Sequence, residues 1–207
     1  MDKQYWNNYY QRHLAPEEPS LFARHMTETY LTPPKRLIDL GCGNGRDARY
    51  FGQCGLHVIA IDQAVAESAV HAGEYVSFAE ADFTNLTPAD SEYDAVYSRF
   101  TLHSVSAVEQ ARTIAWSERA LKIGGYLCIE ARGLHNSLYG VGDPVVGERD
   151  AYIHDDHYRR FIDVDALGDE IRALQFDIAQ LDESRGYAPF GDEDDYFIRL
   201  VAQKRAA

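Results

Sequence analysis

The sequence predicts an α/β protein in which helices cover both faces of a mostly parallel sheet. From Lys35 onward, short apolar segments alternate with segments of helical periodicity, which is typical of parallel sheets. Glycines at every second position after the first apolar segment indicate a sharp turn from strand to helix. The expected strands are Leu37–Ile38, His57–Ile61, Tyr75–Ala79, Tyr93–Tyr97, Tyr126–Ala131, Phe176–Asp182 and Tyr196–Ala202.

Helices are expected between these strands and before the first of them. Residues 1–34 carry aromatic and apolar side chains at helical spacing and predict two short helices, with Ser20 as the N-cap of the second. These helices are either a plain cover of the core or a lid over a substrate. The other expected helices are Arg46–Cys54, Ala64–His71, a long helix through Val108 and Leu121 that Gly124-Gly125 closes, and Asp165–Leu174.

Length, charge and cysteine content limit the class of protein. The 207 residues, 45% of them hydrophobic, predict a single domain over residues 1–207. A net charge of −13 disfavours a nucleic-acid partner, so we expect a small-molecule partner and no nucleic acid. No long apolar run and no signal peptide are present, so we expect no membrane span and a cytoplasmic location. Three cysteines without C-x-x-C spacing argue against a disulfide framework and a zinc site, and no metal is expected.

The segment Asp39-Leu-Gly-Cys-Gly-Asn-Gly-Arg46 restricts the choice of cofactor. A dinucleotide fingerprint, G-x-G-x-x-G, needs a third glycine where this chain has Arg46. An acid at Asp39, two residues before the first glycine, would repel a pyrophosphate but could hold a cationic ligand. The spacing therefore disfavours a nicotinamide dehydrogenase.

An acid followed by G-x-G-x-G resembles the first motif of the class I S-adenosylmethionine-dependent methyltransferases. The resemblance covers Arg36 to Ala131 and includes acids after the second and third strands and the Leu121-Lys-Ile-Gly-Gly-Tyr-Leu element. It implies a Rossmann-like, seven-stranded, mostly parallel sheet with one antiparallel C-terminal strand, and S-adenosyl-L-methionine as cofactor. It assigns Asp39, Gly41 and Gly43 to the methionine moiety, Asp62 to the ribose, Asp82 and Phe83 to the adenine, and Ser98 and Arg99, or instead Arg46, to the methionine carboxylate.

The acceptor side is expected around His103 and the 132–161 insertion, whose weak periodicity predicts a long loop. His103 follows the fourth strand and is the candidate general base, or else a helix-start histidine bonded to a backbone carbonyl. His154 and His157 could bind a metal ion, but we disfavour this because the sequence has no further metal-ligating residues at suitable spacing. The candidate substrate-binding residues are Tyr9, Arg132, His157, Arg159 and Arg160, which favour an anionic or hydroxyl-rich acceptor.

The resemblance to small-molecule members of this family favours O-methylation of a sugar, a sugar acid or a natural-product hydroxyl. The N-P-P-Y and D-P-P-Y tetrapeptides that hold a planar nitrogen in many amino-group methyltransferases are missing from the sequence, which also favours oxygen. Another small acceptor, with a nitrogen, a sulfur or an inorganic oxyanion, is the alternative. A catalytically silent nucleoside-binding scaffold is the alternative from a different class. The sequence indicates no oligomeric state.

Overall fold

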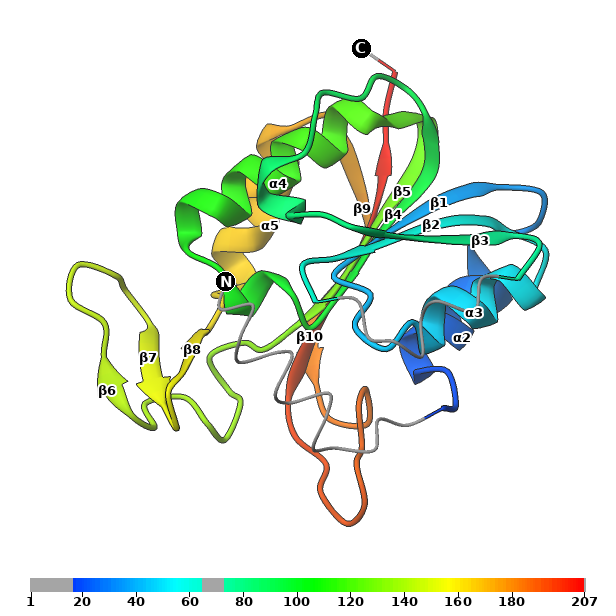
Figure 1. Cartoon of the computed structure of the whole chain (residues 1–207). Coiled ribbons are helices and arrows are strands. Elements are labelled where there is room, and N and C mark those ends of the chain that lie inside the picture. The colour runs from blue at the N-terminus through cyan, green and yellow to red at the C-terminus, as the bar shows by residue number, and fades with distance from the viewer. Residues whose placement is uncertain (1–16, 65–72, 207) are drawn as a thin grey trace.

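The computed structural model describes residues 17–64 and 73–206 and is built on one seven-stranded sheet (Figure 1). The strand order is β3-β2-β1-β4-β5-β10-β9, and β10 is antiparallel to both of its neighbours. The predicted sheet with a single antiparallel C-terminal strand is therefore confirmed. The strands are β1 (Arg36–Leu40), β2 (His57–Asp62), β3 (Val76–Glu80), β4 (Tyr93–Arg99), β5 (Leu121–Ala131), β9 (Phe176–Ser184) and β10 (Phe197–Lys204).

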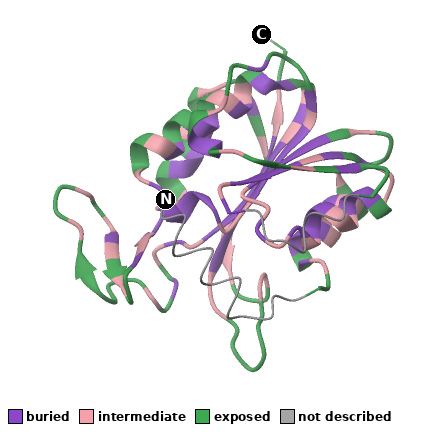
Figure 2. Ribbon diagram, viewed as in Figure 1, coloured by how far each residue is buried: buried purple, intermediate pink, exposed green. Residues whose placement is uncertain are grey.

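Helices cover both faces of this sheet, and each face has its own apolar core. α2 (Leu21–Thr29) and α3 (Arg46–Gln53) pack on one face, where Phe22, Met26 and Phe51 are buried. α4 (Ala107–Ala120) and α5 (Val164–Ala173) pack on the other. Figure 2 shows the buried residues concentrated in the central strands between these two layers. The central strands are therefore screened from solvent on both faces, as near-continuous apolar strands require.

The long helix ends earlier than the sequence predicts. α4 stops at Ala120, and Leu121 already has the extended backbone of β5. The pairing of β4 with β5 shifts between Tyr93, which faces Leu121, and Ala95, which faces Tyr126. Gly124-Gly125 therefore lies in an irregular part of the strand and does not close the helix, because the extra residues of β5 need a local bulge.

The insertion 132–161 is folded, contrary to the expected loop. It contains a small antiparallel sheet of β6 (Asp143–Pro144), β7 (Ala151–His154) and β8 (His157–Arg160), which projects from the main body in Figure 1. Asp155 and Asp156 make the two-residue β7–β8 turn with φ of 50° and 55°. Such positive angles give the turn that matches the twist of a hairpin.

Two expected elements cannot be compared with the structure. The first N-terminal helix with Tyr9, and most of the helix Ala64–His71, lie outside the described residues. The described residues include no helix that is both long and apolar enough to span a membrane.

Candidate functional site

The glycine-rich segment lies where the chain order reverses across the sheet. β2 pairs with one side of β1 and β4 with the other, so the carboxyl ends of three adjacent parallel strands meet there. Open α/β sheets bind their ligands at such a point. The N–H groups of Gly41 and Cys42 donate to the carbonyl oxygen of Ile61 at 2.8 and 2.9 Å, which fixes the segment against β2.

Glycine is required in this segment because its backbone is left-handed. Gly41, Gly43 and Gly45 have φ of +78°, +55° and +74°, which other residues rarely adopt. A Cβ atom on Gly41 would overlap the methyl group of Thr101, and one on Gly45 would overlap the ring of Phe78. The segment therefore brings main chain, without side-chain bulk, to the edge of the sheet before α3 begins.

Asp39 in β1 and Asp62 at the end of β2 differ in their hydrogen bonds. Asp62 accepts from the N–H of Gly43 at 2.9 Å through Oδ2 and from that of Ala64 at 2.8 Å through Oδ1. Asp39 is 3% exposed, and within the described part of the chain no group donates a hydrogen bond to its carboxylate. Burial, together with the charges of Asp47 and Asp62, raises the pKa of Asp39 well above its ordinary value. A buried acid without a donor fits a cationic group on a ligand.

Asp82 follows β3 and caps the short helix η2 (Phe83–Asn85). Its Oδ1 accepts from the backbone N–H of Thr84 at 2.9 Å and from the Thr84 hydroxyl at 2.7 Å. Burial acts to raise the pKa of Asp82, but these hydrogen bonds and one from Gln63 outweigh it, and the pKa is lowered. Phe83 is buried in the core beneath α4, and a Cβ atom on Gly41 would lie 3.8 Å from its ring. Its contact with a base stays a prediction.

A buried carboxylate connects Arg99, at the end of β4, to β5 and β10. Glu130 is completely buried and accepts from Nε of Arg99 at 2.8 Å and from Nε of Arg199 at 2.7 Å. Burial acts to lower the pKa of Arg99, but the charges of Glu130, Tyr97 and Asp47 and the hydrogen bond to Glu130 together outweigh it, and the pKa is raised. Among the described residues only Nε of Arg99 is bonded, so its two terminal nitrogens are available for an anion.

Arg46 adds a second positive charge near Arg99. Burial and the like charge of Arg99 lower the pKa of Arg46, whose guanidinium donates to the carbonyl oxygen of Glu18 at 3.3 Å. Ser98, also predicted to contact the methionine carboxylate, is buried within β4, and its hydroxyl bonds to that of Thr101. The two arginines are therefore better placed than Ser98 to bind an anion.

The sequence did not predict a buried network that ties the N-terminal helix to the site. Ser20 is the N-cap of α2, as predicted, and accepts from the N–H of Ala23 at 3.0 Å. Its hydroxyl also donates to Asp47 at 2.7 Å, and Tyr97 donates to the same carboxylate at 2.9 Å. Asp47 lies close enough to Asp39 for its charge to raise the Asp39 pKa. Ser20 and Tyr97 are 27 and 50 residues from Asp47 in the sequence. No local spacing rule could have indicated these contacts.

His103 lies in the short helix η3 (Leu102–Ser104), just after β4, and is 5% exposed. The backbone N–H of Arg132 donates to its Nδ1 at 3.3 Å. Because Nδ1 is the acceptor, Nε2 carries the proton of the neutral ring. Burial and the neighbouring positive charges, of which Arg132 is the strongest, lower the pKa of His103 well below its ordinary value. This geometry conflicts with a base acting through Nε2, and also with a bond to a backbone carbonyl through Nδ1.

Two adjacent arginines of β8 have different surroundings. Arg160 is buried and donates to the carbonyl oxygens of Val105 at 3.0 Å and Leu102 at 3.3 Å, and it also bonds the side chain of Gln110. It therefore holds β8 against η3 and α4, and a direct contact with an acceptor does not fit these bonds. Arg159 is half-buried, and in the described part of the chain it has no hydrogen-bond or ion-pair partner.

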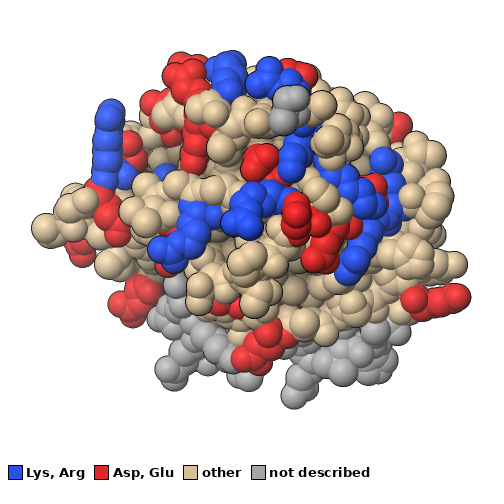
Figure 3. All heavy atoms as spheres, turned by 90° about the horizontal axis from the view of Figure 1, so that it is seen from above, with Lys and Arg blue, Asp and Glu red and all other residues tan. Residues whose placement is uncertain are grey.

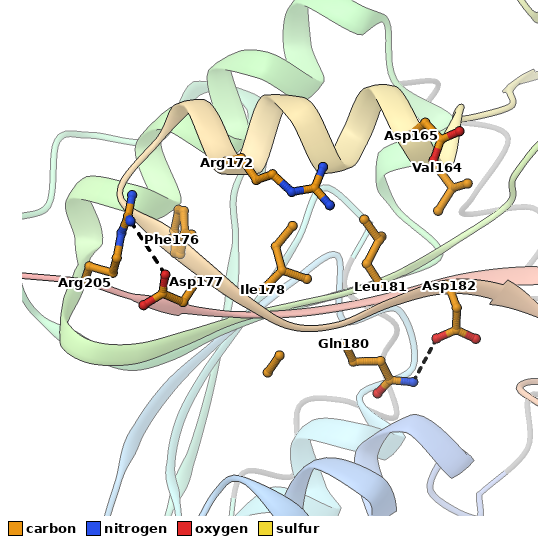
Figure 4. Close-up of a pocket in the computed structure, with 11 residues that line it drawn as sticks. Val164, Asp165, Arg172, Phe176, Asp177, Ile178, Gln180, Leu181, Asp182 and Arg205 are labelled. Carbon is orange, nitrogen blue, oxygen red and sulfur yellow. Dashed lines mark hydrogen bonds and ion pairs between the residues drawn. The ribbon is translucent and has the colours of Figure 1, made fainter.

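A hollow of about 630 Å³ lies between α5 and the edge strand β9 (Figure 4). The strand order separates β9 from β1 and β2, so this hollow is distinct from the glycine-rich segment. Four of its polar residues bind one another, since Arg205 lies 3.7 Å from Asp177 and Gln180 donates to Asp182 at 3.2 Å. We assign no ligand to it.

The described residues include charged side chains of both signs and potential metal ligands. In Figure 3, Lys and Arg side chains alternate with Asp and Glu on the face seen from above and do not form a continuous surface of one sign. Within residues 17–64 and 73–206, no three His, Cys, Asp or Glu side chains are grouped as metal ligands would be. His154 and His157 face each other across the β7–β8 hairpin.

The glycine-rich segment and the strands around it are similar to a known protein family. Residues 38–129 match the family model described as a methyltransferase domain. This match, with the sheet order described above, confirms the resemblance that the glycine spacing indicated. The matched segment, which is less than half of this chain, is therefore similar to the methyltransferase family that the glycine spacing indicated.

Solved structures agree with this fold. A S-adenosylmethionine-dependent methyltransferase from Methanosarcina mazei is 22% identical, with a TM-score of 0.75 over 88% of this chain and 98% of that one. The 1,6-didemethyltoxoflavin-N1-methyltransferase of Burkholderia thailandensis, solved with bound 1,6-didemethyltoxoflavin and S-adenosylhomocysteine, is also 22% identical, with a TM-score of 0.69 over 89% of this chain and 77% of that one.

A curated relative adds a third comparison. The demethylmenaquinone methyltransferase of Renibacterium salmoninarum is 30% identical over 99 residues, which are 47% of this chain and 41% of that protein. The curated relatives match over less than half of their length, since the widest of these matches covers 48% of the relative.

Proposed function

We propose that this chain binds S-adenosyl-L-methionine and transfers its methyl group to an oxygen atom of a small polar acceptor. The observation that supports this best is the buried carboxylate of Asp39, which has no donor among the described residues and lies beside left-handed glycines. A cationic ligand would supply the missing partner. The methionine part of this cofactor carries an ammonium and a sulfonium.

The residues around the glycines fit each part of the cofactor. Asp39 suits the amino group of the methionine part, while Arg46 and Arg99 suit its carboxylate. Each carboxylate oxygen of Asp62 accepts one backbone N–H and keeps a second lone pair for a ribose hydroxyl. Asp82, at the end of the next strand, suits the exocyclic amine of the adenine. Every part of the cofactor thus has a group of matching charge or polarity.

When bound, the cofactor supplies an electrophilic methyl group, and the protein must hold an acceptor in line with it and exclude water. The segment from Arg99 to Ser104 follows β4 beside the glycines, and Arg132 follows β5. We propose this side for the acceptor, with a sugar, sugar acid or natural-product hydroxyl as the predicted chemistry. The relatives named for an N1-methyl transfer and for demethylmenaquinone support other acceptors as the alternative. A cytoplasmic location remains the prediction from the sequence.

Calorimetric titration with S-adenosylmethionine, S-adenosylhomocysteine and NAD tests the cofactor. We expect both sulfur compounds to bind and NAD not to bind. Binding of NAD alone would refute the proposal. A catalytically silent protein would bind both sulfur compounds yet transfer no methyl group to any member of a small-molecule and glycan panel.

A further inference from the structure

The chemistry at the acceptor side depends on the protonation state of His103. Its Nδ1 lone pair is engaged by the N–H of Arg132 at 3.3 Å, and the neutral ring therefore presents an N–H at Nε2. None of the described residues accepts a hydrogen bond from Nε2. A hydroxyl acceptor would need a base to remove its proton, whereas this imidazole offers a donor.

Positive charge gathers around the same ring. Arg132 and Arg159 lie close enough to His103 for their charges to lower its pKa, and β8 packs against η3. Arg159 is half-buried without a partner in the described part of the chain, although its neighbour Arg160 donates three hydrogen bonds. A cation that is partly removed from water and unpaired within the protein favours an anionic ligand.

Aromatic side chains complete this region. The rings of Phe100 and Phe197 stack at 4.8 Å, and the guanidinium of Arg132 lies 6.0 Å and 5.2 Å from their centres. The ring of Phe100 also lies 5.7 Å from that of His103. Phe100 has φ of 60°, a conformation that is costly for a bulky residue and that occurs mainly at functional sites.

We propose that the acceptor is an oxyanion, a carboxylate or phosphate group carried on an apolar body, which His103, Arg132 and Arg159 orient without removing a proton. A lone pair of the anionic oxygen attacks the methyl carbon as the carbon–sulfur bond breaks, and that bond's electron pair stays on the sulfur as a neutral thioether. The product is a methyl ester, and no base takes part. This inference rests on the proposed function and replaces the hydroxyl acceptor with an acid.

Binding of matched probes tests the oxyanion site. The full chain, saturated with S-adenosylhomocysteine, is titrated with benzoate, phenyl phosphate and benzyl alcohol and followed by NMR. We expect at least one anion to bind about tenfold more tightly than the alcohol, because a hydrogen bond to a charged group contributes about 1.5–3 kcal/mol. The two anions distinguish a carboxylate acceptor from a phosphate acceptor.

Arginine variants locate the binding. Arg159→Gln should weaken the preferred anion about tenfold or more. Arg149→Gln is the control, because the side chain of Arg149 is in the same insertion but 89% exposed, and it should leave binding unchanged. Equal binding of the alcohol, no anion binding, or equal effects of the two variants would each refute the inference. Failure of S-adenosylhomocysteine itself to bind would instead refute the proposed function.

Variants of His103 separate a donor from a base. Glutamine can offer an N–H near the position of Nε2 but cannot act as a base, whereas leucine offers neither. With cofactor labelled in its methyl group, and with the preferred anion as acceptor, we expect His103→Gln to keep turnover within about tenfold of the parent and His103→Leu to lose more. Equal loss in both variants, or transfer to the alcohol in preference to the anions, would overturn the donor role. Mild alkali should release the label from a carboxylate ester but not from a phosphate ester.

Discussion

Replacement of Asp39 by asparagine should make the protein more stable while it weakens cofactor binding. The carboxylate is buried without a donor among the described residues and lies near two other acids, Asp47 and Asp62, so its charged form is unfavourable in the folded protein. An unsatisfied buried polar group costs about 1–3 kcal/mol, and each unit of pKa difference corresponds to about 1.4 kcal/mol. Because asparagine removes the buried charge but keeps a polar amide, we expect Asp39→Asn to raise the free energy of unfolding by at least about 1 kcal/mol at pH 8.

The pH dependence of this difference follows from the direction of the pKa shift. The pKa of Asp39 in the folded protein lies above its ordinary value of 3.8, so between the two values the folded protein binds more protons than the unfolded chain. Stability from this group is complete below 3.8 and is lost as the pH rises through the folded pKa. The gain from Asp39→Asn should therefore be large at pH 8 and shrink as the pH falls toward 3.8.

Urea unfolding at several pH values, with calorimetric titration of S-adenosylmethionine, measures both effects. Loss of the Asp39 charge should lower the affinity for S-adenosylmethionine by about ten- to a hundredfold, as for loss of a charge-assisted hydrogen bond. Asp62→Asn is the matched control, because the Asp62 oxygens already accept from Gly43 and Ala64, and this variant should lose stability as well as affinity. An Asp39→Asn protein that is less stable than the parent at pH 8, with unchanged affinity, would show that our view of this carboxylate is wrong.

Two further substitutions test the framework of the site. Gly41→Ala forces a Cβ atom onto the Thr101 methyl group at a φ of +78°, and it should lower cofactor affinity at least tenfold, as measured by calorimetry. Unchanged affinity would mean that the segment moves freely. Glu130→Gln leaves Arg99 and Arg199 buried with no carboxylate between them, and should cost about 3–5 kcal/mol in urea unfolding. A loss below about 1 kcal/mol would mean that water replaces the carboxylate.

Local spacing was sufficient to predict the sheet and the glycine-rich segment. Alternating apolar strands and helices gave the seven strands, and the positions of Gly41, Gly43 and Gly45 matched three left-handed backbone angles. Such features depend on neighbours within a few residues, so the sequence carries them directly. The end of α4 was mispredicted because the pairing of β4 with Leu121 decides it, and a strand pairing is not local.

In the insertion and on the acceptor side, too, contacts between residues distant in the sequence could not be predicted from local spacing. Turn and strand residues in 132–161 are mixed with charged ones, and the β7–β8 turn uses two aspartates in place of the usual glycine. The role of His103 depends on a backbone N–H that is 29 residues away in the sequence. The sequence places an imidazole after the fourth strand. The group that contacts its Nδ1 determines whether its Nε2 donates or accepts a hydrogen bond.

The charged residues of this site fall into two groups by their hydrogen bonds. One group binds neighbouring residues and stabilises the fold, and the other lacks partners within the described residues. Asp47, Glu130 and Arg160 are buried like Asp39, yet each binds its neighbours through two or more hydrogen bonds. Asp39 and Arg159 lack such partners in the described part of the chain, and their charges have opposite sign. A folded protein keeps a desolvated, unpaired charge at a cost, which ligand binding can offset. The unpaired acid therefore supports the proposed cationic cofactor, and the unpaired arginine supports the proposed anionic acceptor.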